Sequence, residues 1–349
     1  MFDLSTLEVP IVGAPMAGGP STPELTAAVC EAGGFGMLAG TYLSLETLRE
    51  QITAVRAATD RPFGVNLFVP EEIPFDEAAF AEYRDLLQLV ADRVGAELPE
   101  TVAYSDDHFD AKIELLLAMN VDAVSFTFDV PSRATIRRFT EAGILTIGTV
   151  TSVREAQRAS GAGVLALCAQ GIEAGGHRAT FHIADDDPQV STADLVAGTI
   201  EATGLPTVGA GGVGSREDVQ ALLDAGAVAA QIGTLLLRCP EAGTRQAHRD
   251  ALADPQFTET VTTRAYSGRL ARGLLNAFIR DYSDLAPALF PQVNTLTGPI
   301  RRAGSDDPQV INLWAGTGFR NARAVPAAEV IAGLSPAPGQ GPVTTSRHT

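Results

Sequence analysis

The sequence predicts an α/β protein, a (β/α)8 TIM barrel that carries a smaller, partly helical domain from the later part of the chain. Short apolar runs alternate with longer stretches of helical period, which is typical of successive βα units. Eight such runs are apolar throughout, as expected of parallel strands buried on both faces. The 349 residues are enough for one such barrel, an appendage and a sizeable core. An open doubly wound sheet is the alternative that the same alternation allows.

The expected elements follow the chain in order. We expect strands at Val9–Ala14, Phe35–Leu38, Phe63–Leu67, Ala123–Phe126, Leu145–Gly148, Val164–Ala169, Thr207–Ala210 and Ala229–Ile232. We expect helices near Thr22–Ala32, Leu45–Ala58, Ala111–Ala118, Ser132–Ala142, Val153–Ala159, Thr192–Ala202 and Arg216–Ala225. Ser21 or Thr22 is the expected N-cap of the first helix, because a side-chain oxygen at that position accepts a free backbone N–H.

Two segments exceed what a barrel needs. Pro70–Ser105 is an acidic insertion after the third strand, with a helix expected near Phe75–Val94. About 110 residues follow the eighth strand, with a helix expected near Ala242–Ala253 and a further run at Ala271–Asp281. We therefore divide the chain into a barrel (1–240, insertion at about 70–105) and a helical extension packing on it (241–334). Residues 335–349, rich in Pro, Gly, Ser and Thr, are predicted to be disordered.

Charge and cysteine content exclude several classes of function. The chain has 25 basic and 42 acidic residues and a net charge of −17, which argues against nucleic acid or an anionic membrane surface as partner. Lys112 is the only lysine, and nothing around it indicates a Schiff base or a P-loop. Cys30, Cys168 and Cys239 fit neither a disulfide framework nor a zinc pattern, so no metal is predicted. We read Cys168, inside an apolar strand, as a packing thiol.

The N-terminal residues show no signal-peptide pattern, and no apolar run reaches the ~18 residues of a membrane span. We therefore expect a soluble, cytoplasmic protein. The oligomeric state is left open by the sequence.

Glycines gather after the last two strands, where a TIM barrel favours phosphate binding. The seventh strand runs into Gly209–Gly214, which includes Gly211 and Gly212, and the eighth into Gln231-Ile232-Gly233-Thr234. Backbone N–H groups at a helix start can hold a phosphate, and glycine lets the anion approach closely. An ordinary tight turn is the alternative for either cluster alone. Neither matches the Rossmann fingerprint, so a single phosphate, as on FMN, fits better than a dinucleotide.

A histidine loop follows the sixth strand. Gln170 lies at the strand end, where its amide could hydrogen-bond the edge of an isoalloxazine ring. Gly175 and Gly176 would let the backbone pass close to a flat ring, and His177 then projects over the same mouth. A neutral imidazole there is suited to act as a general base on a carbon acid. The remaining histidines have no such setting and are read as surface or hydrogen-bonding residues: His108, His182, His248 and His348.

Two earlier loops supply further candidates. The first strand ends in a bend at Ala14 and Met16, where backbone could hydrogen-bond a flavin and the methionine could pack on it. Asn66, a polar residue among apolar neighbours at the end of the third strand, is expected to point into the mouth.

These residues resemble a known family. The chain is similar to the class I nitronate monooxygenases, formerly called 2-nitropropane dioxygenases, over nearly its whole length. The resemblance is carried by PIVGAPMAGGPSTPEL, FGVNLF, VSFTF, QGIEAGGHRATF, GAGGV and QIGT, and past the barrel by YSGRLARGLLNAFI and LWAGTG. The order His108-Phe109 and the pair Ala179-Thr180 depart from the family pattern and could alter the substrate mouth.

The resemblance implies an FMN-dependent enzyme. It places FMN on Ala14, Met16, Asn66, Gln170, Gly175, Gly211, Gly212, Gln231, Ile232, Gly233 and Thr234, and makes His177 the catalytic residue. It implies a substrate-covering domain from the later part of the chain, with Gly176, Tyr266, Ser267 and Trp314 at the substrate mouth.

The implied reaction is oxidation of alkyl nitronates by O2 to a carbonyl compound and nitrite, without metal or nicotinamide. His177 would abstract the α-proton of a neutral nitroalkane and otherwise orient the anion. Because the overall charge repels anions, any attraction must be local, and Arg178, Arg269 and Arg272 are the candidates. Two rival classes are an NAD(P)H-dependent enoyl-ACP or quinone reductase on the same barrel, and a non-catalytic flavoprotein.

Overall fold

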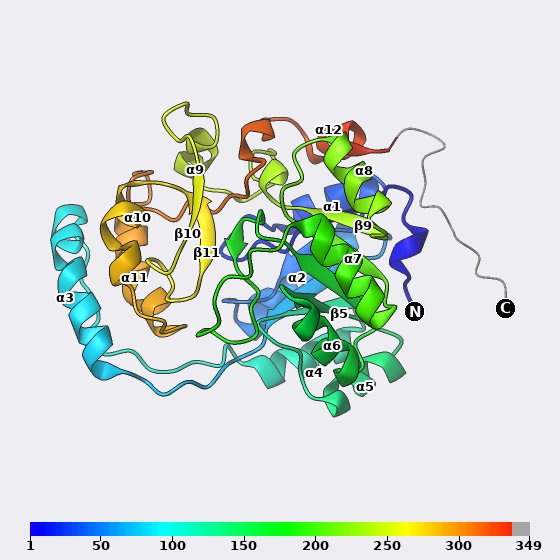
Figure 1. Ribbon diagram of the computed structural model, residues 1–349, viewed down its shortest axis with the longest axis horizontal. Helices are drawn as coiled ribbons and strands as arrows, with labels where there is room; N and C mark the ends of the chain where they lie inside the picture. Colours follow the sequence, from blue (N-terminus) through cyan, green and yellow to red (C-terminus); the bar gives the residue numbers. More distant parts are fainter. Residues whose placement is uncertain (337–349) are drawn as a thin grey trace.

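The computed structural model describes residues 1–336, and its main element is a parallel sheet of eight strands that closes into a barrel (Figure 1). The strands run in the order β1-β9-β8-β6-β5-β4-β3-β2. Phe35, just before β2, closes the sheet: its N–H donates to the carbonyl of Ile11 and its carbonyl accepts from the N–H of Gly13, both at 2.9 Å. The closure excludes the open doubly wound sheet.

The eight barrel strands are shorter at some ends than expected, but all are present. They are β1 (Ile11–Gly13), β2 (Met37–Ala39), β3 (Gly64–Phe68), β4 (Ala123–Thr127), β5 (Leu145–Val150), β6 (Ala166–Gln170), β8 (Thr207–Ala210) and β9 (Ala229–Ile232). The largest shifts of a strand start are at β1, β2 and β6, each of which begins two residues later than the apolar run that predicted it. At β2 the physical reason is that Phe35 pairs only as the closing bridge.

The helices between the strands lie where the periodicity predicts them. They are α1 (Pro23–Glu31), α2 (Leu45–Ala58), α4 (Phe109–Met119), α5 (Arg133–Glu141), α6 (Val153–Ala162), α7 (Thr192–Thr203) and α8 (Arg216–Asp224). Each except α4 begins after a Ser or Thr whose side chain accepts a backbone N–H of the first turn; for α1 this residue is Thr22. The α4 helix begins after His108, whose φ is 56°.

The barrel interior is filled by apolar side chains, which include Val12, Ile147 and Cys168. Cys168 is 3% exposed, and burial raises the pKa of its thiol to about 12. The thiol is therefore protonated at neutral pH, as expected of a packing residue. Among residues 1–336 no cluster of His, Cys, Asp and Glu could hold a metal ion, and no helix of this part is long and apolar enough to cross a membrane.

Further elements lie outside the eight βα units of the barrel. They include a three-stranded antiparallel sheet that the sequence analysis did not predict. The additional elements are η1 (Leu4–Thr6), α3 (Glu77–Val94), β7 (Gly176–His177), η2 (Thr234–Leu236), α9 (Gln246–Ala251), β10 (Thr260–Thr263), β11 (Ala271–Leu274), α10 (Ala277–Tyr282), η3 (Ser283–Leu285), α11 (Gln292–Ala303), η4 (Phe319–Asn321) and α12 (Ala327–Leu334). The sheet order is β10-β11-β7.

Two expectations for this part need correction, and a third falls mostly outside the described residues. The helix expected at Ala242–Ala253 is confined to α9. The run at Ala271–Asp281 divides into β11 and α10, because the side chain of Asn276 accepts the N–H of Ile279 and begins a new helix there. Of the tail predicted to be disordered, residues 337–349 lie outside the described residues.

The insertion packs with the later part of the chain. Figure 1 shows α3, in cyan, beside α11, and the two helices share one apolar cluster. Tyr83 on α3 is fully buried, and its hydroxyl donates to the carbonyl of Ala265 at 2.6 Å. In contrast, α12 packs on α1 and α8 of the barrel. We call residues 71–105 and 241–325 the covering region.

We expect Tyr83→Phe to lower the free energy of unfolding by about 1–3 kcal/mol, because the buried carbonyl of Ala265 loses its donor. The measurement is urea unfolding followed by circular dichroism. Leu89→Ala on the same helix is the control: this leucine is 79% exposed, so a change of about 0.5 kcal/mol or less is expected. An unchanged unfolding midpoint for Tyr83→Phe would contradict the prediction.

Candidate active site

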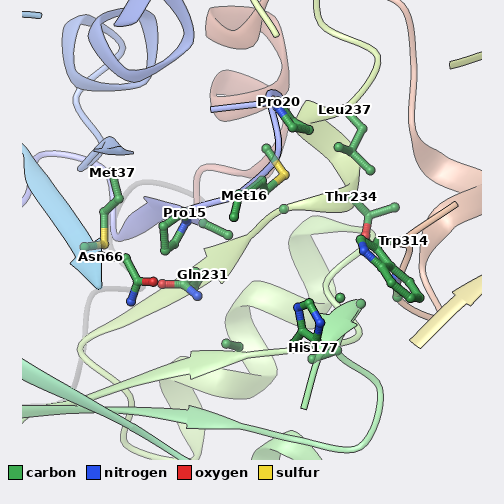
Figure 2. A pocket seen from close by; sticks show the side chains of 18 of the residues that line it. Pro15, Met16, Pro20, Met37, Asn66, His177, Gln231, Thr234, Leu237 and Trp314 are labelled. Atoms are coloured by element: carbon green, nitrogen blue, oxygen red, sulfur yellow. The ribbon is translucent and has the colours of Figure 1, made fainter. Parts of the chain in front are cut away.

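A cavity of about 350 Å³ lies at the carboxyl ends of the barrel strands, between the barrel mouth and the covering region. Loops after β1, β3, β6, β8 and β9 border it, as do Trp314 and Arg301 from the covering region. Figure 2 shows Met16, Asn66, His177 and Trp314 around this space. Chain segments far apart in the sequence therefore meet at the end of the barrel where TIM barrels bind ligands.

The two glycine clusters lie side by side, because β8 pairs with β9. Gly211, Gly212, Gly233 and Thr234 all border the cavity. Within residues 1–336, the backbone N–H groups of Gly212, Val213, Gly233 and Thr234 have no hydrogen-bond acceptor. The Thr234 hydroxyl accepts the N–H of Gly316 at 3.0 Å, which leaves its proton free to donate. Such converging donors are suited to bind an anion.

Gly211 and Gly212 are required by the shape of this loop. Gly212 has a φ of +73° and Gly211 a φ of +132°, and a Cβ on Gly211 would lie 2.7 Å from Thr192 Oγ1 and 2.9 Å from the backbone nitrogen of Ala174. L residues rarely adopt these backbone angles. The loop is thus a glycine-dependent cradle rather than an ordinary turn with room for a side chain.

The earlier loops also reach the cavity. Ala14 and Met16 border it after β1, and Gln231 and Ile232 border it on β9. Asn66 is 2% exposed, and its Nδ2 donates to main-chain and side-chain oxygens of β4 at 2.8–3.2 Å. Its amide is thereby fixed in orientation at the cavity wall, as a binding residue requires.

Gln170 and Gly175 have roles that differ from the expected ones. Gln170 borders the cavity, but its Nε2 donates to the carbonyl of His177 at 2.9 Å, and its Oε1 accepts from Arg178 and from the N–H of Ala179. Its amide therefore holds the histidine loop in place. A Cβ on Gly175 would lie 2.4 Å from the main chain of residues 315–316, so glycine is needed here for a backbone contact rather than for a flat ring.

His177 is the second residue of β7, and the residue before it, Gly176, has a φ of +75°. Its Nε2 is 2.9 Å from Ser267 Oγ, and that hydroxyl donates to the carbonyl of Arg269 at 3.1 Å. When the hydroxyl proton lies on this carbonyl, Ser267 accepts from His177. In that arrangement Nε2 carries the imidazole proton and Nδ1 is the unprotonated nitrogen.

The surroundings of His177 keep the ring uncharged. Desolvation by burial, together with the positive charges of Arg269 and Arg301, lowers its pKa from 6.5 to about 3. Four aromatic rings lie with their centroids 5.8–5.9 Å from the imidazole, on Phe68, Phe128, Phe290 and Trp314. The site thus combines a neutral imidazole with apolar walls.

The residues expected at the substrate mouth divide into two groups. Gly176 and Trp314 border the cavity. Tyr266 is 1% exposed and lies behind Trp314, in an edge-to-face contact at 5.5 Å, with its hydroxyl donating to the carbonyl of Ile311. Ser267 is equally buried and reaches the site only through His177.

Comparison with known proteins agrees with this geometry. The family model described as nitronate monooxygenase matches residues 1–336. The chain belongs to the nitronate monooxygenase family. It is 34% identical to a probable nitronate monooxygenase of Staphylococcus aureus (strain MSSA476), over 96% of this chain and 95% of that one. The chain is therefore an enzyme, of a flavin-dependent family.

Two solved structures show the same architecture. A nitroalkane oxidase from Streptomyces ansochromogenes superposes with a TM-score of 0.92 and 42% identity, covering 95% of this chain and 96% of that one. FabK from Thermotoga maritima superposes with a TM-score of 0.74 and 24% identity, covering 95% and 93%. The second likeness shows the fold alone.

Three arginines were expected to attract an anionic substrate of this nitronate monooxygenase family member. None of the three borders the cavity. Arg178 pairs with Asp187 at 2.7 Å, and Arg269 pairs with Glu71 at 2.9 Å. Arg272 donates to main-chain carbonyls of residues 172 and 260. Each guanidinium is thus bonded to groups of the protein itself, as the burial of Arg178 and Arg269 requires.

Other polar residues that the sequence analysis missed also border the cavity, among them Arg245, His248, Asn294 and Arg301. No Asp or Glu of residues 1–336 borders it, although the chain contains 42 acidic residues. Burial lowers the pKa of His248 to about 4, so this histidine is neutral as well. The sequence held one signal that could have indicated a role for Arg301, namely its place beside the buried apolar positions of α11.

The two departures from the family pattern do not border the cavity. Ala179 and Thr180 are buried, and His108 is exposed. The segment around His108 contacts the cavity lining only indirectly. The Asp107 carboxylate accepts the N–H of Tyr42, and Tyr42 borders the cavity. The same carboxylate pairs with Lys112 at 2.6 Å. The single lysine is therefore a buried structural charge.

We expect the low pKa of His177 to make stability depend on pH. The unfolded chain takes up a proton near pH 6.5, whereas the folded chain does so only near pH 3. Stability from this group is therefore complete above pH 6.5 and is lost as the pH falls towards 3. His177→Asn should remove about 1–3 kcal/mol of the loss measured between pH 7 and 4.5 by urea unfolding.

His108→Asn is the matched control for this measurement, because His108 is exposed and asparagine tolerates its positive φ. It should keep the full pH dependence of the unmodified protein. Equal slopes for His177→Asn and the unmodified protein would show that the imidazole is not held neutral.

Proposed function

We propose that this member of the family is an FMN-dependent nitronate monooxygenase, which oxidises alkyl nitronates with O2 to carbonyl compounds and nitrite. One observation carries the proposal: a cavity that no Asp or Glu of residues 1–336 borders joins a cradle of backbone N–H groups, which have no acceptor among these residues, to a neutral histidine and two arginines. In an acidic chain, this lining favours a ligand and a substrate that are both anionic. The likeness to a nitroalkane oxidase supports a nitro compound as substrate.

The residues present fit FMN. Gly211, Gly212, Gly233 and Thr234 would hold the phosphate through the free N–H groups and the threonine hydroxyl. The isoalloxazine ring would lie among the residues that border the rest of the barrel mouth: Ala14, Met16, Asn66, Gln170, Gly175, Gln231 and Ile232. Bound FMN supplies the electron acceptor for the substrate and the centre that reacts with O2.

His177 positions the substrate and holds a proton at Nδ1 when one must be removed. Ser267 accepts from Nε2 and so fixes the ring with Nδ1 unprotonated. With a pKa near 3, the imidazole is a weak base towards a neutral carbon acid, because its protonated form is strongly disfavoured. The site therefore favours the nitronate, which arrives already deprotonated, over the nitroalkane.

The aromatic wall excludes water from this reaction. Phe68, Phe128, Phe290 and Trp314 surround the imidazole, and a dry site strengthens the attraction between an anion and the nearby arginines. Trp314 is in turn supported by an edge-to-face contact with Tyr266.

The test of this function uses purified holoprotein mixed with ethyl nitronate in air. We expect O2 uptake with release of nitrite, and no requirement for NADH. His177→Asn should lower kcat/KM for nitroethane about ten- to a hundredfold, which is less than the usual effect of removing a general base because the pKa of His177 lies far below the working pH. It should lower kcat/KM for ethyl nitronate less. His108→Asn should leave both unchanged.

If purified holoprotein showed no flavin-dependent O2 uptake with any nitronate, the proposed function would be wrong. Bleaching of the flavin by NADH under anaerobic conditions, within seconds, would instead favour the reductase class. Full activity of His177→Asn towards nitroethane would rule out the imidazole as the base.

We expect Gly211→Ala to weaken FMN binding at least about tenfold, because the added Cβ would displace Thr192 or the main chain at residue 174 and so move the proposed phosphate loop. Gly204→Ala is the control: Gly204 has a φ of +68° but no atom within 4 Å of the added Cβ. It should lose only about 1 kcal/mol of stability through backbone strain and keep its FMN affinity. Fluorescence titration of apoprotein with FMN measures both, and equal affinities would contradict the assignment.

A further inference from the structure

Arg301 is held in a fixed position at the cavity wall. Its Nη2 donates to the main-chain carbonyl of Asn294 at 2.7 Å and to the side-chain Oδ1 of the same residue at 2.9 Å. The carbonyl of Arg301 accepts from Nη1 of Arg245 at 2.9 Å. The two bonds to Asn294 orient the guanidinium, and none of these contacts supplies a negative charge.

The charge of Arg301 has no partner in the part of the chain that the structure describes. No carboxylate of residues 1–336 forms an ion pair with it, and its Nε is closed to solvent without an acceptor. Arg178 and Arg269, the two fully buried arginines, pair with Asp187 and Glu71. Arg301 is half-buried, and it borders the cavity. A cation that is largely removed from water and has no carboxylate partner is costly, so its partner is expected to come from a ligand in the cavity.

The location of Arg301 points to the substrate rather than to the cofactor phosphate. The proposed phosphate loops come from β8 and β9 and have their own free donors, whereas Arg301 lies on α11 in the covering region. Arg301 borders the same cavity as His177 and Tyr42, and its positive charge contributes to the low pKa of His177. Two other cavity-lining atoms without a partner in residues 1–336, Thr244 Oγ1 and His248 Nε2, also belong to the covering region.

We propose that Arg301, oriented by Asn294 and flanked by Arg245, is the receptor for a planar oxyanion of the substrate. That oxyanion is the nitronate group itself or a carboxylate elsewhere on the substrate. A guanidinium is suited to both, because its planar donors match two coplanar oxygens. The inference rests on the proposed function for the identity of the reaction, but not for the binding of the anion.

The binding experiment uses holoprotein and propionate, a planar oxyanion that does not react, with neutral propionamide as its isostere. Calorimetry and the change in flavin absorption report binding without turnover. We expect Arg301→Met to weaken propionate binding about ten- to a hundredfold, the usual effect of losing a charged hydrogen bond, and to leave propionamide unaffected. Arg301→Lys, which keeps the charge and the fold, should lose only part of the affinity.

Arg302→Met is the matched control, because Arg302 is the next residue on α11 and is exposed. It should bind propionate as the unmodified protein does. Undiminished propionate binding by Arg301→Met, or an equal loss in Arg302→Met, would overturn the proposal.

Steady-state kinetics distinguish the two sources of the oxyanion. A raised KM of Arg301→Met for propyl 1-nitronate shows that the nitronate group itself binds Arg301. A raised KM only for a nitronate with a carboxylate at its far end shows that the carboxylate does. Arg301-dependent propionate binding without any nitronate turnover would refute the proposed function alone. Turnover with binding that is independent of Arg301 would refute the receptor alone.

Discussion

The closing bridge at Phe35 is the contact on which the arrangement of the site depends. By joining the edge of β1 to the start of β2, it turns a parallel sheet into a barrel and brings the carboxyl ends of all eight strands to one rim. In an open sheet, the loops after β3 and β9 would lie far apart. In the barrel they border one cavity. Residues that are far apart in the sequence therefore form a single set of groups around one site.

Near that rim, three arginine side chains are held in two different ways. Arg178 and Arg269 are neutralised by carboxylates within hydrogen-bond distance, and they fix the loops behind the site. Arg301 is positioned by amide and carbonyl groups only. Although the chain is acidic, no Asp or Glu of residues 1–336 borders the cavity, and this lining underlies the proposed preference of the site for anions.

The same positive charges shape the chemistry of His177. They act with desolvation to keep the imidazole neutral, and Ser267 decides which nitrogen holds the proton. A neutral ring among aromatic side chains neither repels nor neutralises an approaching nitronate. The cost is weak basicity towards neutral nitroalkanes, so one set of contacts accounts for both the preferred charge and the preferred protonation state of the proposed substrate.

The sequence by itself determined the barrel, because eight apolar runs and the helical periods between them reflect burial that every βα unit repeats. It also indicated Gly211, Gly212 and His177, since glycines and a histidine at strand ends are local signals. Only the tertiary structure decided which arginines face the cavity. Arg178 and Arg301 look alike in sequence, and the difference lies in whether a distant carboxylate such as Asp187 folds onto the guanidinium. The short strand β7 and the packing of α3 on α11 were likewise decided by long-range contacts, which leave no periodic pattern in the chain.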